Sequence, residues 1–253
     1  MNRWGIGAAL FCALIVVAPT AWSQTNLGLA MVPAEQLGMS KQRLDRIHEA
    51  LKQEVEQGKL AGTVVLVARK GKLVYADAVG LQDKEEGKPM ALDSLFRIYS
   101  MTKPLVSVGA MMLVEEGRIQ LTDPVSKFLP AFKGQQVSVA RTDAEFARVT
   151  YASVPADREM TIQDLLRHTS GLVYCGTANT RVKDAYTKAG FCPKSGVLSG
   201  SNERNVKPDE QIDSLAKAPL AHQPGTVWEY GLSVDLLGRV IEAVSGPTSL
   251  QIS

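Results

Sequence analysis

The stretch RIYSMTKPLVSVGAMMLVEEG, residues 97–117, places a serine and a lysine three positions apart at the start of an apolar segment. Ser100 follows a short apolar run at residues 96–99, and Lys103 comes just before residues 105–114, which carry no charge. An uncharged run of that length predicts a helix that is buried on most of its sides. We therefore expect a strand-like segment to lead into Ser100 and a buried helix to begin there.

The spacing of Ser100 and Lys103 suits nucleophilic catalysis. Residues three apart share one face of a helix, so the lysine ammonium group would lie beside the serine hydroxyl group. Burial and the positive end of the helix both disfavour a charged lysine, and we expect them to lower its pKa. A neutral lysine accepts the proton that a serine must lose to attack a carbonyl. The serine's own N–H at the helix start could bind the resulting oxyanion.

The same spacing occurs a second time, at Ser214 and Lys217, and there it predicts only a helix surface. The apolar face of that helix would lie on the opposite side, at Ile212, Leu215 and Ala216. The serine and the lysine would then face solvent. No G-x-S-x-G sequence is present, which argues against the nucleophile elbow of an α/β-hydrolase.

The three histidines predict neither a metal site nor a catalytic base. His48 lies on an expected helix and lacks the second histidine of a zinc motif. His222 lies in the polar turn AHQPG, and His168 follows a short helix, where a histidine most often caps carbonyl groups. We expect no metal and no cofactor.

The composition limits the possible classes of protein. The chain has 253 residues, of which 45% are hydrophobic, so it is long enough for one large domain or two small ones with a substantial core. The formal net charge is +2, and basic residues form no run. Nothing in this charge pattern indicates nucleic acid or an acidic partner.

Residues 1–23 have the pattern of a secretory signal peptide. A single positive charge at Arg3 precedes an apolar stretch at residues 4–18, and residues 21–23, AWS, offer small side chains for cleavage before Gln24. A membrane anchor is the alternative, but the apolar run is shorter than the ~20 residues of a membrane-spanning helix. We expect the mature chain, residues 24–253, to be exported and to be periplasmic or secreted.

Two cysteines, Cys175 and Cys192, remain once the predicted signal peptide is removed. An even pair in an exported protein favours a disulfide, and the alternative is two free thiols. Both cysteines fall in residues 172–208, a polar and glycine-rich stretch without periodicity. We expect that stretch to be a long surface insertion, and loops of such length are often functional.

Hydrophobic periodicity and turn residues predict strands early in the chain and helices afterwards. A hairpin is expected at residues 62–80, with its turn at Lys70-Gly71. Besides the helix after Ser100, we expect helices at residues 40–57, from a capping box at Thr161 and Asp164, at 209–217 and at 233–246.

Several ordered blocks of the chain resemble the serine β-lactamase and penicillin-binding-protein superfamily. The blocks are SMTKP at residues 100–104, EEGRIQLTDPVSKFLPAF at 115–132, TIQDLLRHTSGL at 161–172 and PGTVWEYGLSVDLLGRVIEAVSG at 224–246. They are most similar to the class C branch, which includes the family VIII carboxylesterases. The resemblance implies an α+β fold, in which helices flank an antiparallel sheet.

The resemblance also assigns roles to three residues. Ser100 matches the acylated nucleophile, and Lys103 matches its proton-accepting partner. Tyr230, in WEYGLS, matches the tyrosine of the second family motif, which relays the proton to and from the leaving group. The residues alone would have made Tyr230 a core aromatic beside Trp228.

Two departures from the family pattern bear on function. Class C β-lactamases carry Tyr-x-Asn, whereas Leu232 stands here in place of the asparagine, as in the esterase branch. The third motif of the family and the C-terminal strands of its sheet follow the second motif, and we expect this chain to lack both.

Two hypotheses of different classes follow. The first is an exported serine hydrolase that acts through an acyl-enzyme, on a small-molecule ester, a β-lactam or a peptidoglycan peptide, with esters favoured. The second is a non-catalytic β-lactamase-like chain with at most a ligand-binding or partner-binding role. Neither involves nucleic acid or metal, and the oligomeric state is open in both.

Overall fold

A hairpin and a helix in the first hundred residues form as their local sequence predicts. In the computed structural model of this chain, the strands β1 (Gly62–Arg69) and β2 (Lys72–Asp83) pair antiparallel around Lys70 and Gly71. Both turn residues have positive φ angles, 50° and 70°, which matches a two-residue turn whose twist fits the strands. The expected hairpin is confirmed.

The structure describes residues 28–143, 148–192 and 208–246, and these fall into two compact units. The first unit ends at Arg97 and the second begins at Ile98. The predicted signal peptide, residues 1–23, lies outside the described residues.

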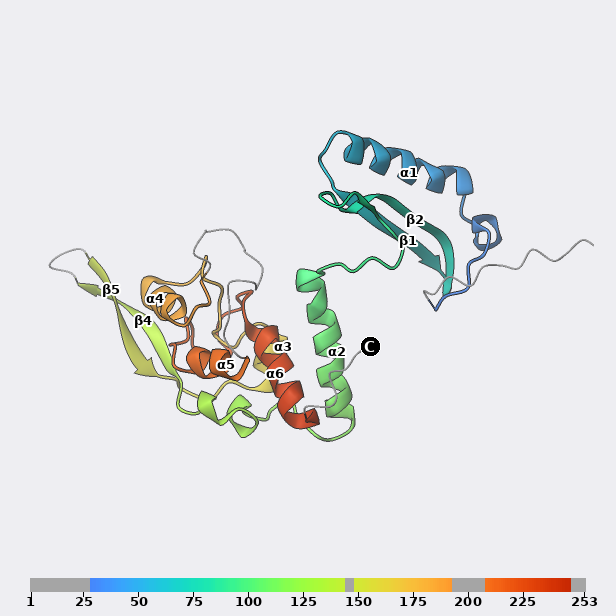
Figure 1. The fold of residues 1–253 in the computed structure, drawn as a ribbon. Coiled ribbons are helices and arrows are strands. Elements are labelled where there is room, and N and C mark those ends of the chain that lie inside the picture. Colours follow the sequence, from blue (N-terminus) through green and yellow to red (C-terminus); the bar gives the residue numbers. More distant parts are fainter. Residues whose placement is uncertain (1–27, 144–147, 193–207, 247–253) are drawn as a thin grey trace, which may run out of the picture. The chain divides into compact units, whose positions relative to one another are not determined.

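The first unit packs one helix on a small sheet. After a 3-10 turn, η1 (Ala34–Leu37), the helix α1 (Lys41–Glu56) begins at Ser40, whose hydroxyl accepts the Arg43 N–H. A short strand, β3 (Lys88–Pro89), adds to β2 and gives the sheet order β1-β2-β3. Figure 1 shows α1 lying along this hairpin. Ala34, Leu44 and Val74 form a buried cluster in this unit.

The second unit contains the helix that follows Ser100. A 3-10 turn, η2 (Tyr99–Met101), leads directly into α2 (Thr102–Glu115), so the expected strand-like conformation of residues 96–99 is wrong. After α2 the chain runs through η3 (Val125–Lys127) and η4 (Pro130–Phe132), which are short 3-10 turns.

An antiparallel hairpin in the middle of the chain was not anticipated. Its strands are β4 (Gln136–Asp143) and β5 (Arg148–Pro155), so strands are not confined to the early part of the sequence. The hairpin carries charged and polar residues such as Arg141 and Thr150, and this obscures the alternation that marks a strand.

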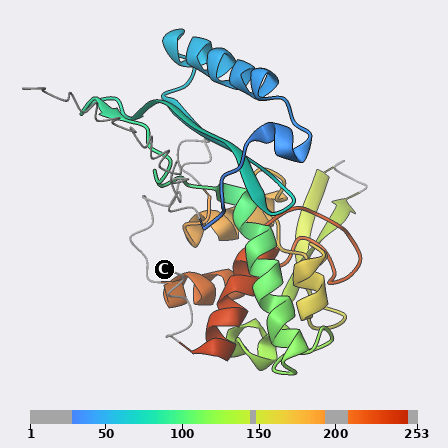
Figure 2. The same ribbon diagram turned by 90° about the vertical axis from the view of Figure 1, so that its right-hand side faces the viewer.

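The described residues of the second unit also form the helices α3 (Ile162–Leu166), α4 (Thr180–Lys188), α5 (Pro208–Ala216) and α6 (Ser233–Ser245). The capping box of Thr161 and Asp164 at α3 is confirmed, as are the helices expected at 209–217 and 233–246. In both views α6 lies beside α2 (Figures 1 and 2), and α3 also packs on α6.

The segment expected to be a surface insertion belongs in part to the core. Residues 180–188 form α4, and the side chains of Leu172, Val173, Val182 and Tyr186 are almost completely buried. Val182 and Tyr186 lie four positions apart on one face of α4, and the polar residues around them hide this short repeat in the sequence. The rest of this segment, residues 193–207, lies outside the described residues.

The helix α2 is only partly covered within its unit. Ala110 and Leu113 are buried, whereas Leu105, Val108 and Met112 are 65%, 59% and 55% exposed. No helix within the described part of the chain combines the length and the apolar character that crossing a membrane requires.

Candidate active site

Ser100 lies at the junction between a strained turn and a helix. Tyr99 directly before it has φ 45°, in the left-handed region that costs energy for a residue with a side chain. The turn η2 begins at this residue and leads into α2, whose first residue, Thr102, lies three positions after Tyr99. Ser100 is exposed there, close to the unpaired N–H groups of the helix start.

Lys103 reaches a group of aromatic and acidic side chains. Its Nζ donates a hydrogen bond to the Tyr174 hydroxyl at 3.1 Å, and it lies 3.9 Å from a carboxylate oxygen of Asp235. The same nitrogen lies 5.0 Å from the centre of the Tyr230 ring, within cation–π range. Its side chain is 17% exposed. Among the described residues, the structure records no hydrogen bond between Lys103 and Ser100.

The pKa of Lys103 is raised above the ordinary lysine value, so the expected lowering is wrong. Burial lowers the pKa, as anticipated, and is the largest single effect. It is outweighed by the hydrogen bond to Tyr174 and the negative charge of Asp235, both of which favour the ammonium form. Because its pKa is raised, Lys103 is a cation at neutral pH. Neither Tyr174 nor Asp235 lies near Lys103 in the sequence.

Tyr230 lies beside Lys103 rather than in the core. It occupies the loop just before α6, and it is 37% exposed. Its ring centre lies 5.0 Å from the Lys103 ammonium nitrogen and 4.8 Å from the centre of the His168 ring, at a tilt of 38°. The structure thus brings together Lys103 and Tyr230, two residues that the family resemblance had paired.

Two segments far apart in the sequence run side by side and bring these residues together. The N–H groups of Ala221, Gly225 and Glu229 donate to the carbonyl oxygens of Gly171, Thr169 and His168 at 2.9, 2.7 and 2.9 Å. The segment 168–173 follows α3, and the segment 220–231 precedes α6. This backbone pairing carries His168 to the side of Tyr230.

A glycine allows the two segments to approach so closely. A Cβ atom on Gly231 would lie 2.5 Å from the Leu172 carbonyl oxygen and 2.6 Å from the Val173 Cα. Both distances are shorter than a real Cβ contact, so only glycine fits at this position.

Tyr174, like Asp235, is a member of the group that the sequence did not predict. It follows the buried pair Leu172 and Val173, and its ring meets that of Tyr230 edge-on, with 5.6 Å between centres. Burial raises the pKa of the Tyr174 phenol, and the Lys103 ammonium group offsets this only in part, so the phenol is neutral at neutral pH. The signal in the sequence was the run HTSGLVY, residues 168–174, which directly follows a short helix. Tyr174 was instead counted with the predicted surface insertion at residues 172–208.

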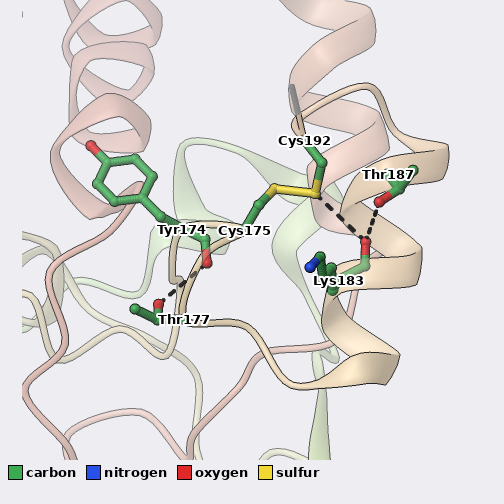
Figure 3. Close-up of a disulfide and its surroundings, with 6 residues drawn as sticks. All are labelled: Tyr174, Cys175, Thr177, Lys183, Thr187 and Cys192. Carbon is green, nitrogen blue, oxygen red and sulfur yellow. Dashed lines mark hydrogen bonds between the residues drawn. A yellow bond between two sulfur atoms is a disulfide. The ribbon is translucent and has the colours of Figure 1, made fainter. Parts of the chain in front are cut away.

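A disulfide lies directly beside Tyr174. Cys175 and Cys192 are joined, with Cα atoms 5.5 Å apart. Figure 3 shows the Tyr174 ring pointing away from this bridge, on the other side of the backbone. The bridge links the Tyr174 turn to the segment that follows α4. The turn is further held by Thr177, whose N–H donates to the Tyr174 carbonyl at 3.1 Å.

The other serines, lysines and histidines considered as site residues lie away from this group and make structural contacts. Ser170 is fully buried and shares a 2.9 Å hydrogen bond with Ser233. Lys217 is exposed just beyond the end of α5, and Ser214 on that helix is half-buried. His48 bonds to Asp77 in the first unit at 2.8 Å.

His222 contacts an acidic side chain, since its Nε2 lies 2.6 Å from a Glu229 oxygen.

Within the described residues, no group of three or more histidines, cysteines and acidic residues could hold a metal ion.

The chain matches one known family over most of its length. The model of the family described as Beta-lactamase matches residues 47–252. The chain belongs to the β-lactamase family. The resemblance to the serine β-lactamase and penicillin-binding-protein superfamily is therefore confirmed.

Relatives in this family include esterases. The chain is 35% identical over 233 residues to esterase EstB of Burkholderia gladioli, with 90% of this chain and 48% of EstB covered. It is 30% identical over 200 residues to the lovastatin esterase of Penicillium rubens, with 78% and 46% covered. The chain spans about half the length of these relatives.

A solved structure confirms the fold class. The structure of EstCE1, described as a hydrolase with promiscuous acyltransferase activity, is similar with a TM-score of 0.61 and 31% sequence identity. The match covers 80% of this chain and 47% of EstCE1. The expected α+β fold of the β-lactamase and transpeptidase type is therefore correct.

Proposed function

We propose that the full-length protein is an exported serine hydrolase that cleaves small ester substrates through an acyl-enzyme on Ser100. The observation that carries this proposal is the position of Lys103, one helical turn after Ser100, in contact with Tyr174 and beside Tyr230. The names of two relatives, esterase EstB and lovastatin esterase, support an ester as the substrate.

In the proposed reaction Tyr230 accepts the proton, because Lys103 is held as a cation. The reacting form is the phenolate, in which the Tyr230 hydroxyl has already given its proton to solvent water. The Ser100 hydroxyl gives its proton to this phenolate oxygen as Oγ bonds to the ester carbonyl carbon. The Lys103 ammonium group attracts the negative charge that the tyrosine oxygen carries in this exchange. When the ester C–O bond breaks, the leaving alcohol takes the proton. A water molecule then repeats the sequence on the acyl-enzyme and releases the acid.

Leu232 favours an ester over a β-lactam substrate. It precedes α6, is 8% exposed and belongs to the core of the unit. At this position the family's β-lactamases carry an asparagine amide that would bind a β-lactam side chain, and a buried leucine offers no such group.

Export is the second part of the proposal. It is supported by the signal-peptide pattern of residues 1–23 and by the Cys175–Cys192 bridge, since disulfides persist mainly in oxidising compartments. Cell fractionation of the native host would test it. The mature protein is expected in the periplasm or the medium, and an uncleaved chain in the membrane fraction would support an anchor instead.

The two Ser-x-x-Lys pairs of this chain provide a matched experiment. The full-length protein is treated with a fluorophosphonate probe, and its hydrolysis of p-nitrophenyl butyrate is measured beside that of a cephalosporin. We expect Ser100→Ala to abolish both labelling and ester turnover, and Ser214→Ala to change neither. Labelling that survives Ser100→Ala, or a cephalosporin cleaved faster than the ester, would contradict the proposal.

A further inference from the structure

We propose that His168 is a positioning residue that orients Tyr230 for proton transfer. Its Nδ1 accepts a hydrogen bond from the N–H of Gly231, the residue that follows Tyr230. The inference rests on the proposed role of Tyr230. It gives a function to a histidine that the sequence placed only at the end of a helix.

His168 holds the backbone on both sides of Tyr230. Its carbonyl oxygen accepts the Glu229 N–H at 2.9 Å, and its Nδ1 accepts the Gly231 N–H in a longer bond of 3.4 Å. Because these two hydrogen bonds lie on either side of Tyr230, they restrict the φ and ψ angles of Tyr230. The direction of the Tyr230 ring therefore depends on where His168 lies.

The ring of His168 adds a side-chain contact to these anchors. It lies 4.8 Å from the Tyr230 ring centre and meets the Trp228 ring edge-on at 6.3 Å. The backbone of His168 is held at φ 55°, in the left-handed region. Asparagine tolerates this conformation better than most residues, and its Oδ1 lies as many bonds from the backbone as the histidine Nδ1. Asparagine is therefore a conservative replacement for the acceptor atom.

The acceptor function requires a neutral imidazole. Both ring nitrogens carry protons in the cation, so a protonated His168 could not accept the Gly231 N–H. The charged groups that act on it are Lys103 from α2 and Asp235 from α6. Burial and the Lys103 ammonium group lower the pKa of His168, and Asp235 raises it more weakly. His168 therefore stays neutral at neutral pH and loses its acceptor only in acid.

Nuclear magnetic resonance of the full-length protein tests the contact without reference to catalysis. We expect the His168 Nδ1 to be unprotonated, and the Gly231 amide shift to titrate with His168 at a pH below the ordinary histidine value of about 6.5. A Gly231 amide that does not follow the titration of His168 would overturn the inference.

Kinetics of two variants test the effect on the reaction. His168→Asn keeps an acceptor and loses the ring, and its kcat for ester hydrolysis should stay within about threefold of wild type. His168→Phe keeps a ring and loses the acceptor, and its kcat should fall at least about tenfold with little change in KM, because the reacting oxygen is misplaced. The reverse ranking of the variants would overturn the inference.

The pH dependence gives a test that survives if His168→Phe fails to fold. The ratio of kcat/KM for His168→Asn to that of wild type should rise as the pH falls below about 6.5, because only wild type loses its acceptor there. A ratio that is flat with pH would overturn the inference. If wild type has no Ser100-dependent turnover but the Gly231 amide still titrates with His168, the proposed function fails and the contact stands.

Discussion

At the scale of single residues, Lys103 shows how partners distant in sequence change the chemistry that a motif implies. The Ser-x-x-Lys spacing located Ser100 and Lys103 because three residues span one helical turn. It could not locate Tyr174 and Asp235, whose contacts keep Lys103 protonated. Tyr230 was identified only by family resemblance, since an isolated aromatic residue carries no spacing signal.

Removing the Tyr174 hydroxyl should shift the alkaline limit of activity. In Tyr174→Phe, burial still lowers the pKa of Lys103, but one of the contacts that raise it is lost. Activity that depends on the Lys103 cation is present below this pKa and disappears as the pH rises through it. The alkaline limb of the kcat/KM profile should therefore move to lower pH.

The pH–rate profile of ester hydrolysis between pH 6 and about 11 checks this prediction. Tyr186→Phe serves as a control, because Tyr186 is fully buried and packs on Phe191 in the core. An alkaline limb that is identical in wild type and Tyr174→Phe would show that Lys103 does not depend on Tyr174.

At the scale of elements, local chemistry predicted the helices with clear ends. Thr161 and Asp164 cap α3 as expected, α1 begins at the cap Ser40 within the expected helix range, and α6 ends at Gly246. The failures are α4 and the β4–β5 hairpin, where polar residues interrupt the periodicity. For these elements, packing against the rest of the unit decides the conformation rather than local propensity.

The close approach of the segments before α6 and after α3 should depend on Gly231. In Gly231→Ala the new Cβ would collide with the backbone of Leu172 and Val173. The segment that carries Tyr230 must then move, and we expect acylation of Ser100 to fall about 10²-fold and unfolding free energy to fall by about 1–3 kcal/mol.

Rates of fluorophosphonate labelling and chemical denaturation measure the two effects. Gly176→Ala is the matched control, since a Cβ there meets nothing within 4 Å and its backbone is not in the left-handed region. Equal labelling rates for the two alanine variants would contradict the role of Gly231.

The disulfide should stabilise the turn that carries Tyr174. It closes a loop with a sequence separation of 17, and a bridge of that span is worth about 3 kcal/mol in the chain-entropy model. We expect Cys175→Ser/Cys192→Ser to lower the unfolding free energy by up to this amount. Because Tyr174 is the neighbour of Cys175, the variant should also label more slowly with the fluorophosphonate probe.

Denaturation with and without a phosphine reductant measures the contribution of the bridge. The reductant should destabilise wild type and leave the double serine variant unchanged. Two titratable thiols in the untreated, exported protein would refute the bridge.

At the scale of the whole molecule, α2 carries more apolar surface than its unit covers. Ala110 and Leu113 face the core, whereas Leu105, Val108 and Met112 lie largely exposed. Contiguous apolar surface of this kind drives association when nothing covers it. The sequence indicated this need for cover, because residues 105–114 contain no charge on any side.

We therefore expect residues 24–253, expressed alone, to bind a hydrophobic dye strongly and to self-associate. The replacements Leu105→Glu and Val108→Lys should reduce both effects in that fragment. Dye fluorescence and size-exclusion chromatography check the prediction, and near-UV circular dichroism reports whether the fragment is folded. A monomeric fragment with a cooperative thermal transition and low dye binding would show that α2 is adequately covered.

The sequence by itself determined the family and the starts of α1, α3 and α6, and it predicted that Ser100 and Lys103 act together. These features depend on residues that are neighbours in the chain, where caps, turns and helical spacing act directly. Only the tertiary structure decided that Tyr174 and His168 lie around Lys103 and Tyr230. Backbone hydrogen bonds between residues 168–173 and 220–231 bring them together, and no local pattern encodes such bonds. The same contacts reversed the expected pKa shift of Lys103, because charge and burial at a site depend on everything that packs there.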